Sequence, residues 1–182
     1  MVIGDSKTDG APCCTATGGY QPYLLEQLIH SEQHNDVEII GDLSNGGWTT
    51  ATAYSNFAAF AATMTQDPDF VLINLGTNDL ADIRTGSLVE AAWAMDDLLD
   101  AIHAEWPSAQ ARLMRVIRTD YTTEQDLLDD TWIPNVLASR SAWASLGPDE
   151  RVFLPPDLGD TTHPTQVGYQ KTGTQWRWNL GY

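Results

Sequence analysis

The sequence predicts an α/β fold in which a central parallel sheet is sandwiched between layers of helices. Short apolar runs alternate along the whole chain with stretches whose apolar residues recur at helical spacing. The most apolar run, at residues 70–75, is nearly continuous, as expected for a strand buried on both faces. The length of 182 residues fits a single domain that spans residues 1–182.

Taken in chain order, the expected strands and helices alternate. Strands are expected at residues 1–3, 37–40, 70–75, 113–117 and 152–154, and helices at residues 20–29, 51–61, 87–106, 123–143 and 166–178. Pro107 ends the third helix, and Pro134 marks a break in the fourth. A strand–helix order repeated in this way favours parallel pairing of the strands.

The charge balance is strongly acidic. Asp and Glu number 25 against 9 Lys and Arg, which gives a formal charge of −16. Such a chain repels polyphosphates and anionic membrane surfaces, so nucleic-acid and membrane-surface functions are disfavoured. A neutral or cationic substrate fits better. Cys13 and Cys14 are adjacent, a spacing that strains a disulfide, and we interpret them as free thiols or an incidental loop pair.

Polar residues follow four of the predicted strands or lie near their ends. In open α/β sheets, ligands bind at the carboxyl ends of the strands. The residues expected at that edge are Gly4, Asp5 and Ser6; Asn45, Gly46 and Gly47; Gly76, Thr77, Asn78 and Asp79; and Asp160, Thr161, Thr162 and His163.

These residue types are those that acyl transfer requires. Ser6 can attack a carbonyl carbon if His163 accepts its proton, and Asp160, three residues earlier, can orient the imidazole. Asp157 is the nearest rival carboxylate. The Ser6 N–H, the N–H of a glycine at 46 or 47, and the Asn78 amide are candidate donors to an oxyanion.

Three of these blocks, Gly4-Asp5-Ser6, Gly76 to Asp79 and Asp160 to His163, resemble those of the SGNH, or GDSL, hydrolase superfamily in the family's order. The resemblance implies a three-layer α/β/α sandwich of the SGNH hydrolase, flavodoxin-like kind, with no metal and no organic cofactor. It also implies that Ser6, His163 and Asp160 form a catalytic triad. The implied oxyanion hole consists of Ser6, a second-block glycine and Asn78.

The second block fits the family pattern less well. Gly47-Trp48-Thr49-Thr50 aligns best with its ending, so Gly47 is the preferred oxyanion glycine and Gly46 the alternative. Trp48, beside this glycine, is the candidate substrate-binding residue. The G-x-S-x-G motif of the α/β-hydrolases is absent.

Several further residues have expected roles beside these blocks. Lys7 stands where the family commonly has an apolar residue, and it is expected to alter the pocket's charge or to point to water. Asp5 is expected to brace the nucleophile loop, and Asp79 to hydrogen-bond nearby loops. A further set of tryptophans lies on helical patterns and is expected in the core: Trp93, Trp106, Trp132 and Trp143.

The resulting prediction is a serine esterase that hydrolyses short-chain carboxylic esters, with acetyl esters of carbohydrates as a plausible target. The expected partner is therefore a small-molecule or carbohydrate ester. Alternatives are a lysophospholipase or thioesterase of the same fold, and a catalytically idle carbohydrate-binding domain, which the intact triad disfavours. The start of the sequence lacks signal-peptide features, which suggests the cytoplasm, whereas carbohydrate deacylation would suggest export.

Overall fold

The computed structural model describes residues 1–10, 19–31, 37–86 and 88–182. Cys13 and Cys14 lie outside these described residues, so their expected thiol state stays a prediction. Among the described helices, none combines the length and the apolar character needed to cross a membrane.

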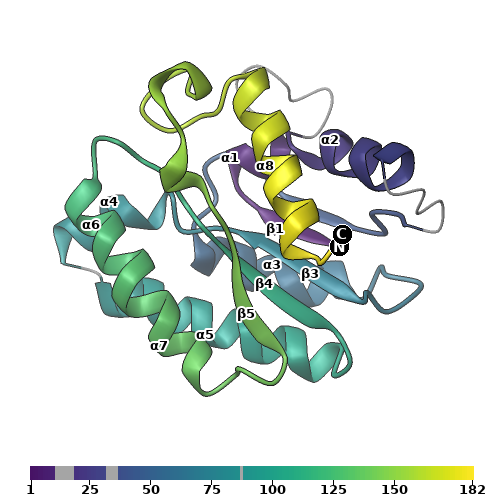
Figure 1. The fold of residues 1–182 in the computed structure, drawn as a ribbon. Helices are drawn as coiled ribbons and strands as arrows, with labels where there is room; N and C mark the ends of the chain where they lie inside the picture. Colours follow the sequence, from purple (N-terminus) through teal and green to yellow (C-terminus); the bar gives the residue numbers. More distant parts are fainter. Residues whose placement is uncertain (11–18, 32–36, 87) are drawn as a thin grey trace.

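Five parallel strands form the central sheet, in the order β2-β1-β3-β4-β5 (Figure 1). Their bounds are β1 Val2–Gly4, β2 Asp42–Ser44, β3 Phe70–Asn74, β4 Gln110–Arg115 and β5 Ala144–Asp149. Because all pairs are parallel, the carboxyl ends of the strands meet at one edge of the sheet. The chain after β5, yellow-green at the top of Figure 1, passes over this edge.

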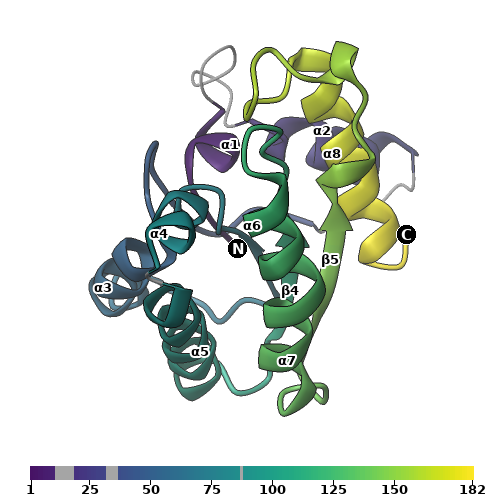
Figure 2. The same cartoon turned by 90° about the vertical axis from the view of Figure 1, so that its left-hand side faces the viewer.

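Helices cover both faces of the sheet (Figures 1 and 2). One face carries α2 (Gln21–Glu26), η1 (Gln27–Ser31) and α8 (Gln166–Asn179), and the other carries α3 (Thr50–Ala61), α5 (Leu88–Glu105) and α7 (Ile133–Ala138). The remaining short helices are α1 (Ser6–Asp9), α4 (Asp79–Thr85), α6 (Thr122–Leu127), η2 (Leu128–Trp132), η3 (Glu150–Val152) and η4 (Pro155–Asp157). The three-layer α/β/α architecture predicted from the sequence is confirmed.

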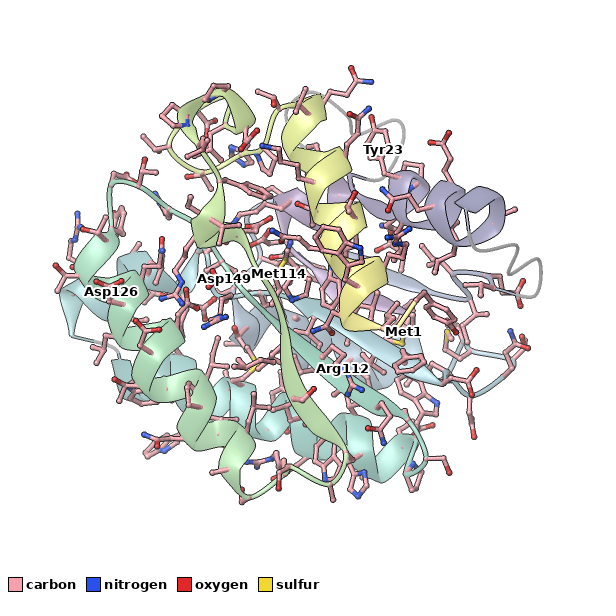
Figure 3. All side chains as sticks on the ribbon, viewed as in Figure 1. Met1, Tyr23, Arg112, Met114, Asp126 and Asp149 are labelled. Atoms are coloured by element: carbon pink, nitrogen blue, oxygen red, sulfur yellow. The ribbon has the colours of Figure 1, made fainter. Side chains whose placement is uncertain are left out.

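Successive strand residues point to opposite faces, which divides the core into two clusters. Ile3 and Ile73 belong to the larger cluster, under α3, α5 and α7, whereas Val2, Leu72 and Met114 belong to the smaller one, under α2 and α8. Figure 3 shows Met114 in the sheet beneath α8. Burial on both faces explains why β1 and β3 are almost wholly apolar.

The second strand is not where the sequence predicts it. Residues 37–40 are irregular, and β2 instead pairs Asp42 with Val2 and Ser44 with Gly4. Val37 and Ile39 still pack against the smaller core cluster, so their apolar character reflects burial without sheet pairing. As an edge strand, β2 needs only one deeply buried side chain, that of Leu43.

The last strand was also misplaced by the apolar pattern. Residues 152–154 are not a strand, and the side chains of Val152 and Leu154 are each 62% exposed. The edge strand is β5, whose sequence ASLGPD contains Gly and Pro and has low strand propensity. Pairing with β4 supplies what this local sequence lacks.

Other differences are smaller. Strand β4 begins earlier than predicted, at Gln110, and helix α4 was not predicted at all. The predicted fourth helix divides into α6, η2 and α7, with Pro134 accommodated in the first turn of α7. Trp106 is buried as expected, but Trp93 is 65% exposed, so its assignment to the core was wrong.

Candidate active site

Ser6 is the first residue of α1, directly after β1. The Asp5 carboxylate caps this short helix by accepting the Lys7 N–H at 3.0 Å, as the expected bracing role requires. Gly10 ends the helix in the left-handed conformation, with φ of 92°, and its N–H bonds the Ser6 carbonyl oxygen. A Cβ on Gly4 would overlap the Thr8 side chain, so the turn requires glycine at that position.

His163 lies within hydrogen-bonding distance of both Ser6 and Asp160. Its Nε2 is 3.0 Å from the Ser6 Oγ, and its Nδ1 is 2.8 Å from the Asp160 Oδ2. The structure therefore places in one chain of contacts the three side chains that the sequence singled out. His163 lies 157 residues after Ser6 in the chain, and Asp160 precedes His163 by three residues.

Asp160 also organises the turn on which His163 stands. Its Oδ1 accepts the backbone N–H groups of Thr162 and His163, each at 2.7 Å. Partial burial by itself raises the pKa of Asp160, but these bonds and the His163 ring outweigh it and hold the pKa below its ordinary value. Asp160 is therefore ionised around neutral pH and can stabilise an imidazolium.

The rival carboxylate, Asp157, is engaged elsewhere. It accepts the Leu154 N–H at 2.9 Å and pairs with the Lys171 ammonium at 2.7 Å. Its backbone carbonyl accepts the Thr165 N–H at 2.8 Å. Asp157 thus ties η4 to the start of α8 and supports the loop that carries His163.

The glycines of the second block lie at the exit of β2. A Cβ added to Gly46 would lie 3.9 Å from the Ser6 Cβ, which places Gly46 beside the serine. Gly47 has a φ of 81°, the left-handed region that favours glycine, and open space where a Cβ would be.

Asn78 joins this loop to the exit of β3. Its Nδ2 donates a hydrogen bond to the Trp48 carbonyl oxygen at 2.9 Å. Trp48 itself is half-buried, and its side chain packs against the larger core cluster. The expected oxyanion donors therefore lie on neighbouring loops at the same edge of the sheet as Ser6.

Asp79, the first residue of α4, caps the amino terminus of helix α3. Both of its carboxylate oxygens accept the Thr50 N–H, each at 3.1 Å, in the first turn of that helix. Burial raises the pKa of Asp79 to about 6, although these hydrogen bonds oppose the effect. The expected hydrogen-bonding role to a nearby loop agrees with this contact.

Lys7 does not point to water, which was one of its two expected placements. Its side chain is fully buried, and its Nζ lies 2.7 Å from the Glu150 Oε2. It also donates to the Ile117 carbonyl oxygen at 3.1 Å. Sequence reasoning missed Glu150, because nothing in the local sequence distinguishes it from the other acidic residues.

A hollow with a volume of about 360 Å³ lies away from this site, at the amino ends of the strands. Its lining includes Met1, Leu28, Phe70 and Tyr182. None of the predicted site residues lines it. Within the described residues, no group of three or more His, Cys, Asp or Glu side chains is placed to hold a metal ion.

Comparison with known structures shows the same architecture in several esterases. A family 3 carbohydrate esterase from Clostridium thermocellum is 18% identical over 99% of this chain and 93% of its own, with a TM-score of 0.79. A family 3 carbohydrate esterase from Talaromyces cellulolyticus is 20% identical over 99% and 94%, with a TM-score of 0.80. A mutant acetyl esterase with an acetate ion is 20% identical over 99% and 94%, with a TM-score of 0.77. At these identities the likeness concerns the fold.

The sequence itself matches a family model. No curated protein sequence matches the chain significantly. The model of the GDSL-like lipase/acylhydrolase family, however, matches residues 2–171, which is nearly the whole chain. The protein therefore belongs to the GDSL-like lipase/acylhydrolase family and is a carboxylic ester hydrolase.

Proposed function

We propose that this esterase hydrolyses short-chain carboxylic esters, with acetyl esters of carbohydrates as its natural substrates, through Ser6, His163 and Asp160. The observation that carries the proposal is the contact chain from the Ser6 Oγ through both ring nitrogens of His163 to the Asp160 carboxylate. Nucleophile, base and orienting carboxylate in this sequence are the parts of a serine hydrolase.

The reaction follows from these contacts. With Nδ1 protonated and donating to Asp160, Nε2 is the nitrogen that can accept the Ser6 proton. The Ser6 oxygen then attacks the ester carbonyl carbon, and the alcohol leaves with the proton from His163. Water, deprotonated by His163 in turn, attacks the acyl-enzyme and releases the carboxylic acid with Ser6 restored.

The oxyanion of each tetrahedral intermediate needs donors on one side of Ser6. We assign the Ser6 N–H, the Gly47 N–H and the Asn78 side-chain amide to this role. Asn78 has two Nδ2 hydrogens and uses one toward Trp48, which leaves one for a substrate oxygen. Gly46, which lies beside the Ser6 Cβ, is the alternative backbone donor.

The substrate class rests on charge and on similarity. A formal charge of −16 favours neutral esters over anionic ones. Three of the structurally similar proteins are carbohydrate or acetyl esterases, which supports an acetylated sugar as the target. Trp48, half-buried at the exit of β2, is the side chain we propose as a wall for the sugar ring.

The test compares wild type, Ser6→Ala and the control Ser55→Ala, whose serine is exposed on α3. Each is assayed on p-nitrophenyl acetate, butyrate and octanoate, and on acetylated xylo-oligosaccharides by acetate release. We expect rates that fall with acyl length, and a loss of about 10³-fold or more in Ser6→Ala alone. Activity surviving in Ser6→Ala would refute the mechanism, and a preference for octanoate would refute the short-chain assignment. Failure to release acetate from the oligosaccharides would refute the carbohydrate assignment.

A further inference from the structure

An ion pair lies in the protein interior behind the nucleophile turn. The Lys7 Nζ and the Glu150 Oε2 are 2.7 Å apart, and both side chains are completely hidden from solvent. Of the ion pairs formed by the described residues, no other has both side chains fully buried. A single lysine and a single glutamate have thus been removed from water together.

The pair joins the two chain segments that supply the triad. Lys7 directly follows Ser6, and Glu150 begins η3, in the segment that continues to Asp160 and His163. The two partners are 143 residues apart, much as Ser6 and His163 are 157 apart. The Lys7 ammonium also bonds the Ile117 carbonyl oxygen, just beyond β4, so it connects three segments at the carboxyl ends of the strands.

We infer that Lys7 and Glu150 are positioning residues, whose buried ion pair holds the nucleophile turn and the acid–base segment in register so that Ser6 stays within reach of His163. This inference rests on the proposed function, in which Ser6 is the nucleophile. Neither residue is assigned any contact with the substrate.

Stability alone is a weak reason for such a pair. Removing two charges from water costs free energy that their attraction only partly returns, and apolar residues of similar size often serve equally well. What a short charge-assisted hydrogen bond adds is a fixed distance and direction, which apolar contacts lack. Asp5 organises the turn internally, through the Lys7 N–H, whereas the Lys7 side chain reaches out to the other segments.

The consequence for catalysis follows from the geometry of proton transfer. The Ser6 Oγ is 3.0 Å from the His163 Nε2, and a displacement of about 1 Å between such groups costs up to about 100-fold in rate. Loss of the pair should therefore lower kcat while leaving substrate binding, and hence KM, nearly unchanged. A purely structural role would instead lower the melting temperature without slowing the folded enzyme.

The test uses Lys7→Met and the double variant Lys7→Met/Glu150→Met. Burial raises the pKa of Glu150 and the Lys7 ammonium opposes this, so in Lys7→Met the carboxyl can take up a proton instead of remaining as an unpaired charge. The double variant removes both charged groups, which keeps the test available if the single variant does not fold. The control is Arg140→Met, which breaks the pairs with Asp96 and Asp100.

All variants are first checked for folding by circular dichroism and assayed well below their melting temperatures. We expect kcat for p-nitrophenyl acetate to fall about 10- to 100-fold in both Lys7 variants, with KM within about twofold of wild type and Arg140→Met unaffected. A wild-type kcat in either folded Lys7 variant would overturn the inference, because packing alone would then suffice to position Ser6.

Labelling with diisopropyl fluorophosphate separates this inference from the proposed function. The rate of phosphorylation at Ser6, located by mass spectrometry, should fall in the Lys7 variants in parallel with kcat. If wild type is not labelled at Ser6, the proposed nucleophile is wrong. If wild type is labelled at Ser6 and the Lys7 variants react equally fast, only the positioning role is wrong.

Discussion

The Asn78 side-chain amide donates a hydrogen bond to the carbonyl oxygen of Trp48, across 2.9 Å. This bond joins the loop after β3 to the loop after β2, and the neighbouring Asp79 reinforces it by accepting the Thr50 N–H. The two loops that carry the proposed oxyanion donors are thus fixed to each other before any substrate binds. Such preorganised donors cost no reorganisation during the reaction.

Asn78→Ala should therefore slow the chemical step. We expect kcat for p-nitrophenyl acetate to fall about 10²- to 10³-fold with little change in KM, because the donor acts on the oxyanion and not on the bound ester. Steady-state kinetics of folded protein measures both constants. Asn56→Ala, at an exposed position on α3, is the matched control and should behave as wild type. A large rise in KM without loss of kcat in Asn78→Ala would contradict this role.

The two adjacent glycines should respond differently to alanine. Gly47 has a φ of 81°, a conformation that costs a side-chain-bearing residue about 1–2 kcal/mol, so alanine there should shift the proposed N–H donor. We expect kcat to fall about tenfold or more in Gly47→Ala. In Gly46→Ala the new Cβ would meet the Ser6 Cβ at 3.9 Å, an ordinary contact, and kcat should change less than about threefold. The reverse order of effects would assign the donor to Gly46.

Asp160→Asn should disable His163 while leaving the fold intact. The amide oxygen can still accept the Thr162 and His163 N–H groups, but the amide cannot stabilise an imidazolium, and its NH2 group opposite Nδ1 favours the wrong ring tautomer. We expect kcat to fall about 10²- to 10⁴-fold at an unchanged melting temperature. Asp157→Asn, the matched control, should keep kcat within a few-fold and lower the melting temperature, because it loses the pair with Lys171. Equal kcat losses in both variants would argue against the specific role of Asp160.

Asp129 should make stability depend on pH. The residue is 1% exposed in η2, and burial raises its pKa to about 8, with Asp149 adding to the effect and Arg151 opposing it. The unfolded carboxyl releases its proton near pH 4. Between about pH 4 and about pH 8 the folded protein thus binds more protons than the unfolded chain, so this carboxyl lowers the free energy of unfolding as pH rises.

Asp129→Asn removes this titration. The free energy of unfolding of the variant minus that of wild type should increase across the window by up to about 1.4 kcal/mol per pH unit and level off above about pH 8. Urea denaturation from pH 4 to pH 9 measures it. The exposed Asp126→Asn on α6, labelled in Figure 3, should show no such trend. A difference that is constant with pH would show that Asp129 titrates normally.

The layered fold and the edge at which the site lies were predictable because they depend on patterns that span many residues. The continuous apolar run at β3 and the helical spacing of α3 and α8 were placed nearly as the structure has them. The positions of the two outermost strands of the sheet, β2 and β5, were not predicted correctly. A strand with one neighbour needs few buried side chains, so the sequences around Leu43 and Pro148 carry little strand signal, while nearby apolar residues such as Val152 mislead.

Within the candidate site, a contact between residues close in the sequence could be predicted, whereas a contact between residues far apart in the sequence could not. Asp160 and His163 are three residues apart, and their contact could be expected from spacing alone. The pairing of Lys7 with Glu150 spans 143 residues and depends on how two loops pack, which no local pattern encodes. A lysine beside a serine at the start of a chain is ordinarily solvated, so its burial became visible only in three dimensions.

The distance along the chain between Ser6 and His163 bears on biosynthesis. The residues that flank the serine leave the ribosome before those that carry the imidazole, and β1 takes an interior place in the sheet between β2 and β3. The imidazole that faces the serine is translated 157 residues later. While those residues are being added, the nascent polypeptide carries the serine without its proposed base. Under the proposed mechanism, a product terminated before His163 would be chemically silent toward cellular esters.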